Sequence, residues 1–302
     1  MLTKKDKLFF LKLLSLFSMV RGYNILIIVL AQYLTAIFIL APELPISAVV
    51  FDPKLFVLIL ASAGVIAAGY IINNFYDKEK DLINRPQKSK LDRLLSQQTR
   101  LIGYFLLNFL SVILASYVSF KAVAFFSIYI FSIWLYSHKL KRYPIVGNII
   151  AAILSITPFF AIFIYYKNFD KIIFVHATFL FLMLMIKEII KDLGNLKGDF
   201  VQNYKTIPVV YGEKTAKVLL TLLVCLSLVP VYFLLSNDEL GYMYLYFYAS
   251  IGLLFIFLIG TWWAKTTKKY TWLHNIIRFI IVIGTFSIML IDIHMIIDRI
   301  LR

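Results

Sequence analysis

The sequence predicts an all-α multi-pass membrane bundle of about nine transmembrane helices, forming a single domain over residues 1–302. Of the 302 residues, 61% are hydrophobic and only 16% are charged, against roughly 25% charged in ordinary soluble domains. A soluble chain of ~300 residues buries only about 75% of its surface on folding, so it could not hide this much apolar surface. The composition excludes a soluble enzyme, a disordered chain and a collagen-like fibre.

Nine apolar segments recur along the chain, each near the ~20 residues with which a helix crosses the hydrocarbon core of a bilayer. They lie at 23–41, 55–74, 101–118, 122–136, 146–165, 172–190, 217–235, 241–263 and 276–296. The basic and apolar N-terminal stretch lacks a small-residue cleavage site, so we interpret it as an amphipathic helix leading into the first span. Two long polar loops, 75–100 and 191–216, follow the second and sixth spans.

The basic residues are distributed asymmetrically between the two sides of these spans. The formal net charge is +15, which in a soluble protein would suggest a nucleic-acid partner. Here the charges lie between apolar runs, so we expect contact with membrane lipids and no nucleic acid. With the N-terminus inside, 25 of the 31 Lys and Arg fall on the inner side. The positive-inside rule then predicts an integral protein of the cell membrane whose N-terminus and polar loops are cytoplasmic.

A first polar cluster begins at the inner end of the second span. Asn73, Asp77 and Asp81 are spaced i, i+4, i+8, so they would share one face of a continuing helix. Asn74 lies beside that face, and we expect the helix to end at residues 84–86, because the residue before a proline resists helical geometry. Carboxylate and amide oxygens are the hard ligands that Mg²⁺ prefers.

A second polar cluster begins at the inner end of the sixth span, where Asp192, Asn195 and Asp199 also share one helical face. Two acidic faces at the same membrane depth suggest a cleft, and crowded carboxylates repel one another unless a cation lies between them. Mg²⁺ held in this way is completed by substrate phosphates, and nearby Lys and Arg can bind the remaining phosphate oxygens. An apolar bundle around such a cleft fits a lipid diphosphate.

Several motifs in these clusters match a known family. Residues 73–81 read N-N-F-Y-D-K-E-K-D and are followed by Asn84-Arg85-Pro86, while residues 191–199 read K-D-L-G-N-L-K-G-D. These runs resemble the motifs N-D-x-x-D-x-x-x-D, N-x-P and K-D-x-x-D-x-x-x-D of the UbiA superfamily of intramembrane prenyltransferases. The chain is most similar to the branch named for geranylgeranylglycerol-phosphate geranylgeranyltransferase. Asn74 and Asn195 replace aspartates of the family pattern, which removes charge but keeps an oxygen ligand.

The resemblance implies a Mg²⁺-dependent transfer of a prenyl group from an isoprenyl diphosphate to a membrane-associated acceptor, a prenylglycerol phosphate. It implies catalytic and metal-binding roles for Asp77, Asp81, Asp192 and Asp199, with Asn73 as a further metal ligand. The substrate-binding residues that it implies are Arg21, Asn24, Asn73, Asn74, Asn84, Arg85, Lys141, Arg142 and Asn195.

Other interpretations remain open at the level of sequence. Related family members prenylate aromatic quinone precursors at nearly the same diphosphate site, so the acceptor is a lipid or an aromatic compound. A transporter of lipid phosphates would also place cations at the inner leaflet, although it would more often show inverted repeats and polar groups near the midplane. A non-catalytic protein on the same fold is the third alternative. Glu188 could act in catalysis or pair with a lysine, and His176 is interpreted as a hydrogen-bonded packing residue.

Overall fold

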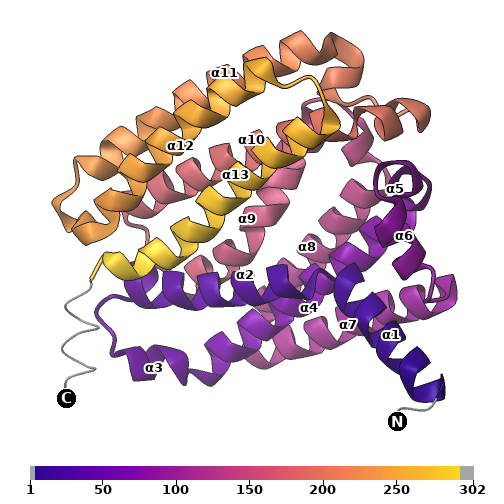
Figure 1. Cartoon of the computed structure of the whole chain (residues 1–302). Coiled ribbons are helices and arrows are strands. Elements are labelled where there is room, and N and C mark those ends of the chain that lie inside the picture. The colour runs from indigo at the N-terminus through magenta and orange to yellow at the C-terminus, as the bar shows by residue number, and fades with distance from the viewer. Residues whose placement is uncertain (1–3, 293–302) are drawn as a thin grey trace.

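A computed structural model of the protein describes residues 4–292 and shows a single helical bundle (Figure 1). The N-terminal helix α1 (Lys4–Met19) precedes nine helices long and apolar enough to cross a membrane within the described part of the chain. These are α2 (Gly22–Thr35), which continues as a π-helical turn over Ala36–Leu40, α4 (Pro53–Tyr76), α7 (Gln97–Val118), α8 (Phe120–His138), α9 (Val146–Tyr166), α10 (Lys171–Val201), α11 (Ile207–Leu235), α12 (Tyr244–Trp263) and α13 (Thr267–Ser287). The fold class and the number of spans are confirmed.

Short helices connect the long ones: α3 (Ile46–Val50), α5 (Lys78–Asn84), α6 (Pro86–Asp92), and 3-10 turns at Leu140–Arg142, Asp238–Met243 and Ile288–Leu290. The polar segments at 75–100 and 191–216 are largely helical, because α5, α6, the end of α10 and the start of α11 occupy most of both. α13 begins at Thr267 instead of 276, and the predicted end of the ninth span, 293–296, lies outside the described residues.

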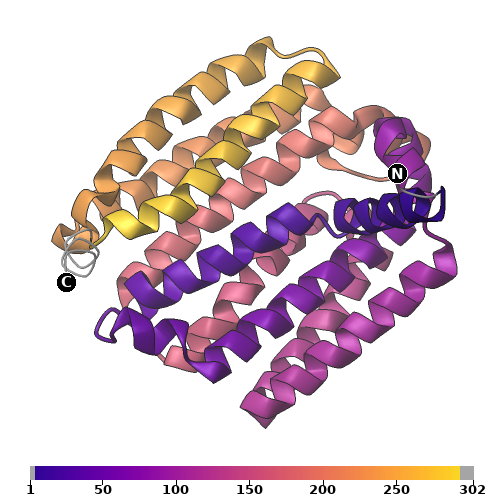
Figure 2. The same cartoon turned by 60° about the horizontal axis from the view of Figure 1, so that its bottom comes forward.

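The two ends of the bundle differ in what they carry. In both orientations α5, α6 and the connection between α10 and α11 gather at one end, whereas α3 lies at the other (Figures 1 and 2). Residues 75–100 and 191–216, which are far apart in the sequence, are thus brought to the same end of the molecule. This end is called the polar end below.

Apolar side chains cover much of the outer surface, as expected for helices that face lipid instead of water. On α7, for example, Phe105 is 66% exposed and Phe109 is 64% exposed, while Tyr104 and Asn108 of the same helix are buried. Close helix contacts use small residues, as is common where no hydrophobic effect draws helices together. A Cβ on Gly64 of α4 would lie 2.3 Å from the hydroxyl of Ser111 on α7.

Helix α9 contains Pro158, which lacks the N–H that would bond the carbonyl of Leu154. The hydroxyl of Tyr129 on α8 donates to that freed carbonyl at 2.9 Å. On α2, Gln32 is fully buried and donates through Nε2 to the carbonyl of Pro158 at 3.0 Å. Tyr129 thus satisfies the one carbonyl that the proline leaves unpaired, which is how membrane helices tolerate proline.

Candidate functional site

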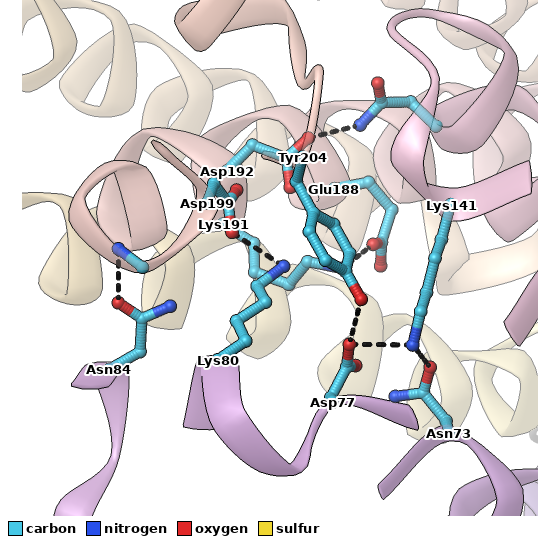
Figure 3. A network of polar contacts seen from close by, with 12 residues as sticks. Asn73, Asp77, Lys80, Asn84, Lys141, Glu188, Lys191, Asp192, Asp199 and Tyr204 are labelled. Atoms are coloured by element: carbon cyan, nitrogen blue, oxygen red, sulfur yellow. Dashed lines mark hydrogen bonds and ion pairs between the residues drawn. The ribbon is translucent and has the colours of Figure 1, made fainter. Parts of the chain in front are cut away.

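The first polar cluster is not one continuous helix. α4 ends at Tyr76, Asp77 has non-helical angles (φ −90°, ψ 6°), and α5 begins at Lys78. The expected uninterrupted face through Asn73, Asp77 and Asp81 is therefore wrong. The break redirects the chain, so that Asp77 and Lys80 face the interior of the polar end (Figure 3). The expected stop is confirmed, because Arg85 is non-helical and Pro86 is the first residue of α6.

Asp77 is the centre of a buried group of contacts (Figure 3). One of its carboxylate oxygens lies 2.7 Å from Nζ of Lys141 and accepts a hydrogen bond of 2.9 Å from the hydroxyl of Tyr204. Lys141 also donates to the side-chain oxygen of Asn73 at 3.1 Å. Three separate segments, at 73–77, 140–142 and 202–206, therefore meet at this carboxylate.

Burial opposes ionisation of Asp77, but the ammonium groups of Lys141 and Lys80 outweigh it and hold the pKa of this carboxyl below its usual range. For Tyr204, burial and the neighbouring charge shift the pKa in the same direction. Burial and the adjacent Asp77 carboxylate both raise the pKa of the phenol above its ordinary value. The hydroxyl therefore stays protonated and continues to donate to Asp77.

The second polar cluster continues helix α10 without a break. Asp192 is buried and accepts a hydrogen bond of 2.8 Å from the side-chain amide of Asn148 on α9. One turn earlier, the Glu188 carboxylate lies 3.4 Å from Nζ of Lys187 and also pairs with Lys191. At the end of the helix, Asp199 is fully buried and lies 2.7 Å from Nζ of Lys80 on α5.

Asp77 and Asp192 line one polar pocket of about 440 Å³, including its opening. Three carboxylates and three lysines share the walls, so the formal charges balance. Such a lining suits a ligand that brings both anionic oxygens and its own cations. The residues are Asn73, Asp77, Lys80, Tyr136, Lys141, Tyr143, Gly147, Asn148, Glu188, Lys191, Asp192, Tyr204 and Thr206.

Asn74 does not line this pocket, although its neighbour Asn73 does. Its amide donates to Asp92 at 2.7 Å, and its oxygen accepts from Arg100 at 3.2 Å. Arg100 also donates to the carbonyl of Leu95 at 3.1 Å. This buried group ties α4 to α6 and α7, so the Asn74 side chain is engaged in contacts between helices.

The remaining predicted residues, including Asp199, do not line the pocket. Asn84 accepts a hydrogen bond of 3.2 Å from the backbone N–H of Gly198, and so links α5 to α10. Arg142 lies 5.4 Å from the ring of Tyr204, and Arg21 lies 5.0 Å from the ring of Tyr70. Four further predicted residues are half-buried outside the lining: Asn24, Asp81, Arg85 and Asn195.

Sequence reasoning did not select several of the residues that line the pocket. Lys80 and Lys191 lie within the two motifs, and their charge beside the carboxylates could have identified them. Tyr204 carried no such signal, because it comes from a short connection whose path depends on packing. Glu188, left open between two roles, does pair with lysines.

The donor set of the pocket fits Mg²⁺. In residues 4–292 no three His, Cys, Asp or Glu side chains gather into a ready-made metal cage. Mg²⁺ does not need such a cage, because proteins usually hold it through one or two carboxylates while waters and substrate phosphates complete its shell. Asp77 and Asp192 supply two carboxylates to one pocket, and Asn73 supplies an amide oxygen beside them.

A second, apolar pocket of about 1000 Å³, including its opening, lies between α2, α9, α10, α12 and α13. Ile156, Phe163 and Met183 are among its lining residues. His176 also lines it, with Nδ1 lying 3.0 Å from the carbonyl oxygen of Ile172, which agrees with the expected hydrogen-bonded packing role. α9 and α10 contribute lining residues to both pockets, the polar one and the apolar one.

These features define a class: a polytopic helical membrane protein with a charged pocket at one end and an apolar pocket within its bundle. The chain belongs to the UbiA prenyltransferase family, which matches residues 14–283. The resemblance found in the motifs is thereby confirmed.

Individual relatives agree with this assignment. Digeranylgeranylglyceryl phosphate synthase of Methanobrevibacter smithii is 28% identical over 291 residues, which are 90% of this chain and 98% of that protein. A structure reported for digeranylgeranylglyceryl phosphate synthase in membranes aligns with a TM-score of 0.69 and 19% identity, covering 92% of this chain and 97% of the other. A UbiA homologue from Archaeoglobus fulgidus, bound to GPP and Mg²⁺, gives a TM-score of 0.63 and 16% identity, with 91% and 99% covered.

Proposed function

We propose that this protein transfers an isoprenyl group from an isoprenyl diphosphate to the hydroxyl of a prenylglyceryl phosphate, in the presence of Mg²⁺. The observation that carries the proposal is that Asp77 and Asp192, from distant segments, line one pocket together with three lysines. The name of the Methanobrevibacter smithii relative, which aligns over nearly its whole length, supports glyceryl phosphate as the acceptor class.

In this proposal the metal-binding residues are Asp77, Asp192 and Asn73. Bound Mg²⁺ would supply positive charge against the diphosphate as its ester C–O bond breaks. Lys80, Lys141 and Lys191, which line the pocket, would donate further hydrogen bonds to phosphate oxygens beside their carboxylate contacts. Their ammonium charges then stabilise the leaving diphosphate more than the intact ester, which lowers the barrier. Asp199, ion-paired with Lys80, keeps that lysine directed toward the pocket.

The apolar pocket supports a place for the isoprenoid chain. α10 passes first along the apolar pocket, at Met183, and then along the polar pocket, at Asp192. A diphosphate held at the polar end therefore leaves its hydrocarbon tail pointing into the bundle. We further propose that the polar end faces the cytoplasm, because most Lys and Arg lie on that side of the spans.

The test is a transfer assay on the full chain in lipid nanodiscs, with Mg²⁺, radiolabelled geranylgeranyl diphosphate and geranylgeranylglyceryl phosphate. We expect a doubly prenylated product, its loss on chelation with EDTA, and losses of at least 100-fold in Asp77→Asn and Asp192→Asn. Glu43→Gln is the matched control, because Glu43 is exposed outside the polar pocket.

Three results would contradict the proposal. Activity that survives both aspartate substitutions would show that the pocket is not the site. Prenylation of an aromatic acid instead of the glyceryl phosphate would correct the acceptor. Movement of a labelled lipid phosphate across the membrane without product would indicate a transporter.

A further inference from the structure

The polar pocket contains a third carboxylate that the proposed metal and diphosphate sites do not use. Glu188 lines the pocket with Asp77 and Asp192 and is only 8% exposed. It lies on α10 one turn before Asp192, a rise of about 6 Å along the helix axis. Met183, which lines the apolar pocket, comes still earlier on the same helix. Glu188 thus lies where the charged pocket gives way to the apolar interior.

This is the depth at which the reacting carbon of an isoprenyl diphosphate must lie. In the proposed function the diphosphate is held at the polar end and the tail extends into the bundle. The carbon that joins them therefore lies between the metal-binding carboxylates and the middle of the bundle. The acceptor oxygen has to approach that same carbon, to within about 3–3.5 Å in a reactive geometry. Glu188 lies one turn from Asp192 on the side of the bundle interior, which is the depth at which the acceptor hydroxyl has to approach.

The surroundings of Glu188 keep its carboxylate ionised. A buried carboxyl without a partner tends to take up a proton, because burial disfavours the charged form. Here Lys187 lies 3.4 Å from one carboxylate oxygen and Lys191 pairs with the other. Both lysines belong to the same helix as Glu188, so the local sequence K-E-I-I-K provides this arrangement. The result is a buried anion that can accept a proton.

We infer that Glu188 is the catalytic base that takes the proton of the acceptor hydroxyl, an inference that rests on the proposed function. The C–O bond of the diphosphate ester breaks with its electron pair going to the diphosphate. A lone pair of the acceptor oxygen forms the new C–O bond to the allylic carbon. The O–H pair stays on that oxygen while the proton passes to the Glu188 carboxylate, leaving an ether, a diphosphate and a protonated Glu188.

The two lysines do not prevent this role. The hydroxyl becomes strongly acidic once its oxygen bonds to the allylic carbon, so a carboxylate paired with two lysines can still accept its proton. The lysines also help after the transfer, because they favour release of the proton and restore the ionised carboxylate for the next cycle.

The experiment compares Glu188→Gln with the unchanged protein in the nanodisc assay above. The amide keeps the size of the side chain but cannot take up the proton. We expect kcat to fall about 100-fold or more, within the range contributed by general bases, while KM for geranylgeranyl diphosphate stays near that of the unchanged protein. We also expect geranylgeraniol, formed when water captures the cation, to increase relative to the ether product.

Two further measurements separate proton acceptance from a merely structural role. An acceptor analogue with a thiol in place of the hydroxyl is far more acidic and can react as its thiolate, so its transfer should be much less sensitive to Glu188→Gln. Glu188→Asp keeps a carboxylate and should recover part of the lost kcat. Lys191→Met is the comparison for a purely structural role. If Glu188 only held Lys191 in place, Glu188→Gln would give the same kinetic pattern as Lys191→Met.

The inference is overturned if Glu188→Gln keeps the full kcat, since the leaving diphosphate would then be the proton acceptor. It is also overturned if Glu188→Gln raises KM for the diphosphate as Lys191→Met does, or if the thiol acceptor loses as much activity as the hydroxyl. These results leave the proposed function intact. Absence of ether product from the unchanged protein overturns both.

Discussion

The side-chain amide of Asn74 donates a hydrogen bond of 2.7 Å to the carboxylate of Asp92, although the adjacent Asn73 contacts Lys141 in the polar pocket. Two consecutive asparagines therefore serve different parts of the protein. The Asn74 contact joins the end of α4 to α6 and, through Arg100, to the start of α7. Because α5 lies between α4 and α6, this buried group also holds the segment that carries Lys80.

Replacing Asn74 should therefore lower the stability of the protein more than it lowers the rate of prenyl transfer. Asn74→Ala leaves the Asp92 and Arg100 partners unsatisfied in a buried place, at a cost of about 1–3 kcal/mol. We expect a lower melting temperature in detergent, with prenyl transfer reduced far less than in Asp77→Asn when both are measured well below that temperature. Gln98→Ala on the exposed first turn of α7 is the control. An Asn74→Ala protein with unchanged stability and no activity would instead make Asn74 a substrate contact.

A second prediction concerns the proline in α9. Tyr129→Phe removes the donor to the Leu154 carbonyl, and we expect a loss of about 0.6–2 kcal/mol, the range for such bonds within membranes. Pro158→Ala supplies a backbone N–H to the same carbonyl. Unfolding of both single variants and the double variant forms a double-mutant cycle. Tyr129→Phe should cost less in the Pro158→Ala background, and strictly additive effects would contradict this account.

A third prediction compares two glycines. A Cβ on Gly198 would lie 2.4–2.6 Å from the end of the Asn84 side chain, so Gly198→Ala must displace Asn84 and break the hydrogen bond that joins α5 to α10. We expect reduced prenyl transfer, because Lys80 is carried by α5. Nothing lies within 4 Å of a Cβ on Gly252 in α12, so Gly252→Ala should stabilise the protein by about 0.5–1 kcal/mol without loss of activity. Equal effects of the two substitutions would argue against a role for the α5–α10 link.

The fourth prediction tests Tyr204, which no motif identified. Its hydroxyl donates to Asp77 at 2.9 Å and its ring lies 4.4 Å from Nζ of Lys80. Tyr204→Phe keeps the ring and removes one hydrogen bond to a charged group, worth about 1.5–3 kcal/mol. We expect a fall in kcat/KM of about 10-fold to 150-fold, measured with geranylgeranyl diphosphate. Tyr204→Leu also removes the ring beneath Lys80, so its kcat/KM should be lower still. Equal activity of Tyr204→Phe and the unchanged protein would show that the hydrogen bond to Asp77 does not contribute to catalysis.

Much of the site could be anticipated, but not its boundaries. Asp77 and Asp192 were selected from spacing and charge, and they do share a pocket. The assumption that failed was helical continuity through Asp77. With α4 ended at Tyr76, Asp81 no longer follows Asn73 around one helix face, and it lies outside the pocket lining. The i, i+4, i+8 spacing places residues on one face only while the helix continues. A single non-helical residue changes the direction of every side chain after it.

The class of protein, the number of spans and the two segments with polar chemistry can all be inferred from the sequence. This is possible because a bilayer requires long apolar helices and excludes charge from their middles. Both requirements produce patterns in the local sequence. Helix packing is what brings Asn73 and not Asn74 to Lys141, Tyr204 to Asp77, and Glu188 to the pocket. Those contacts join segments 60 or more residues apart or depend on a local break in a helix, so they follow from packing, which no local pattern specifies.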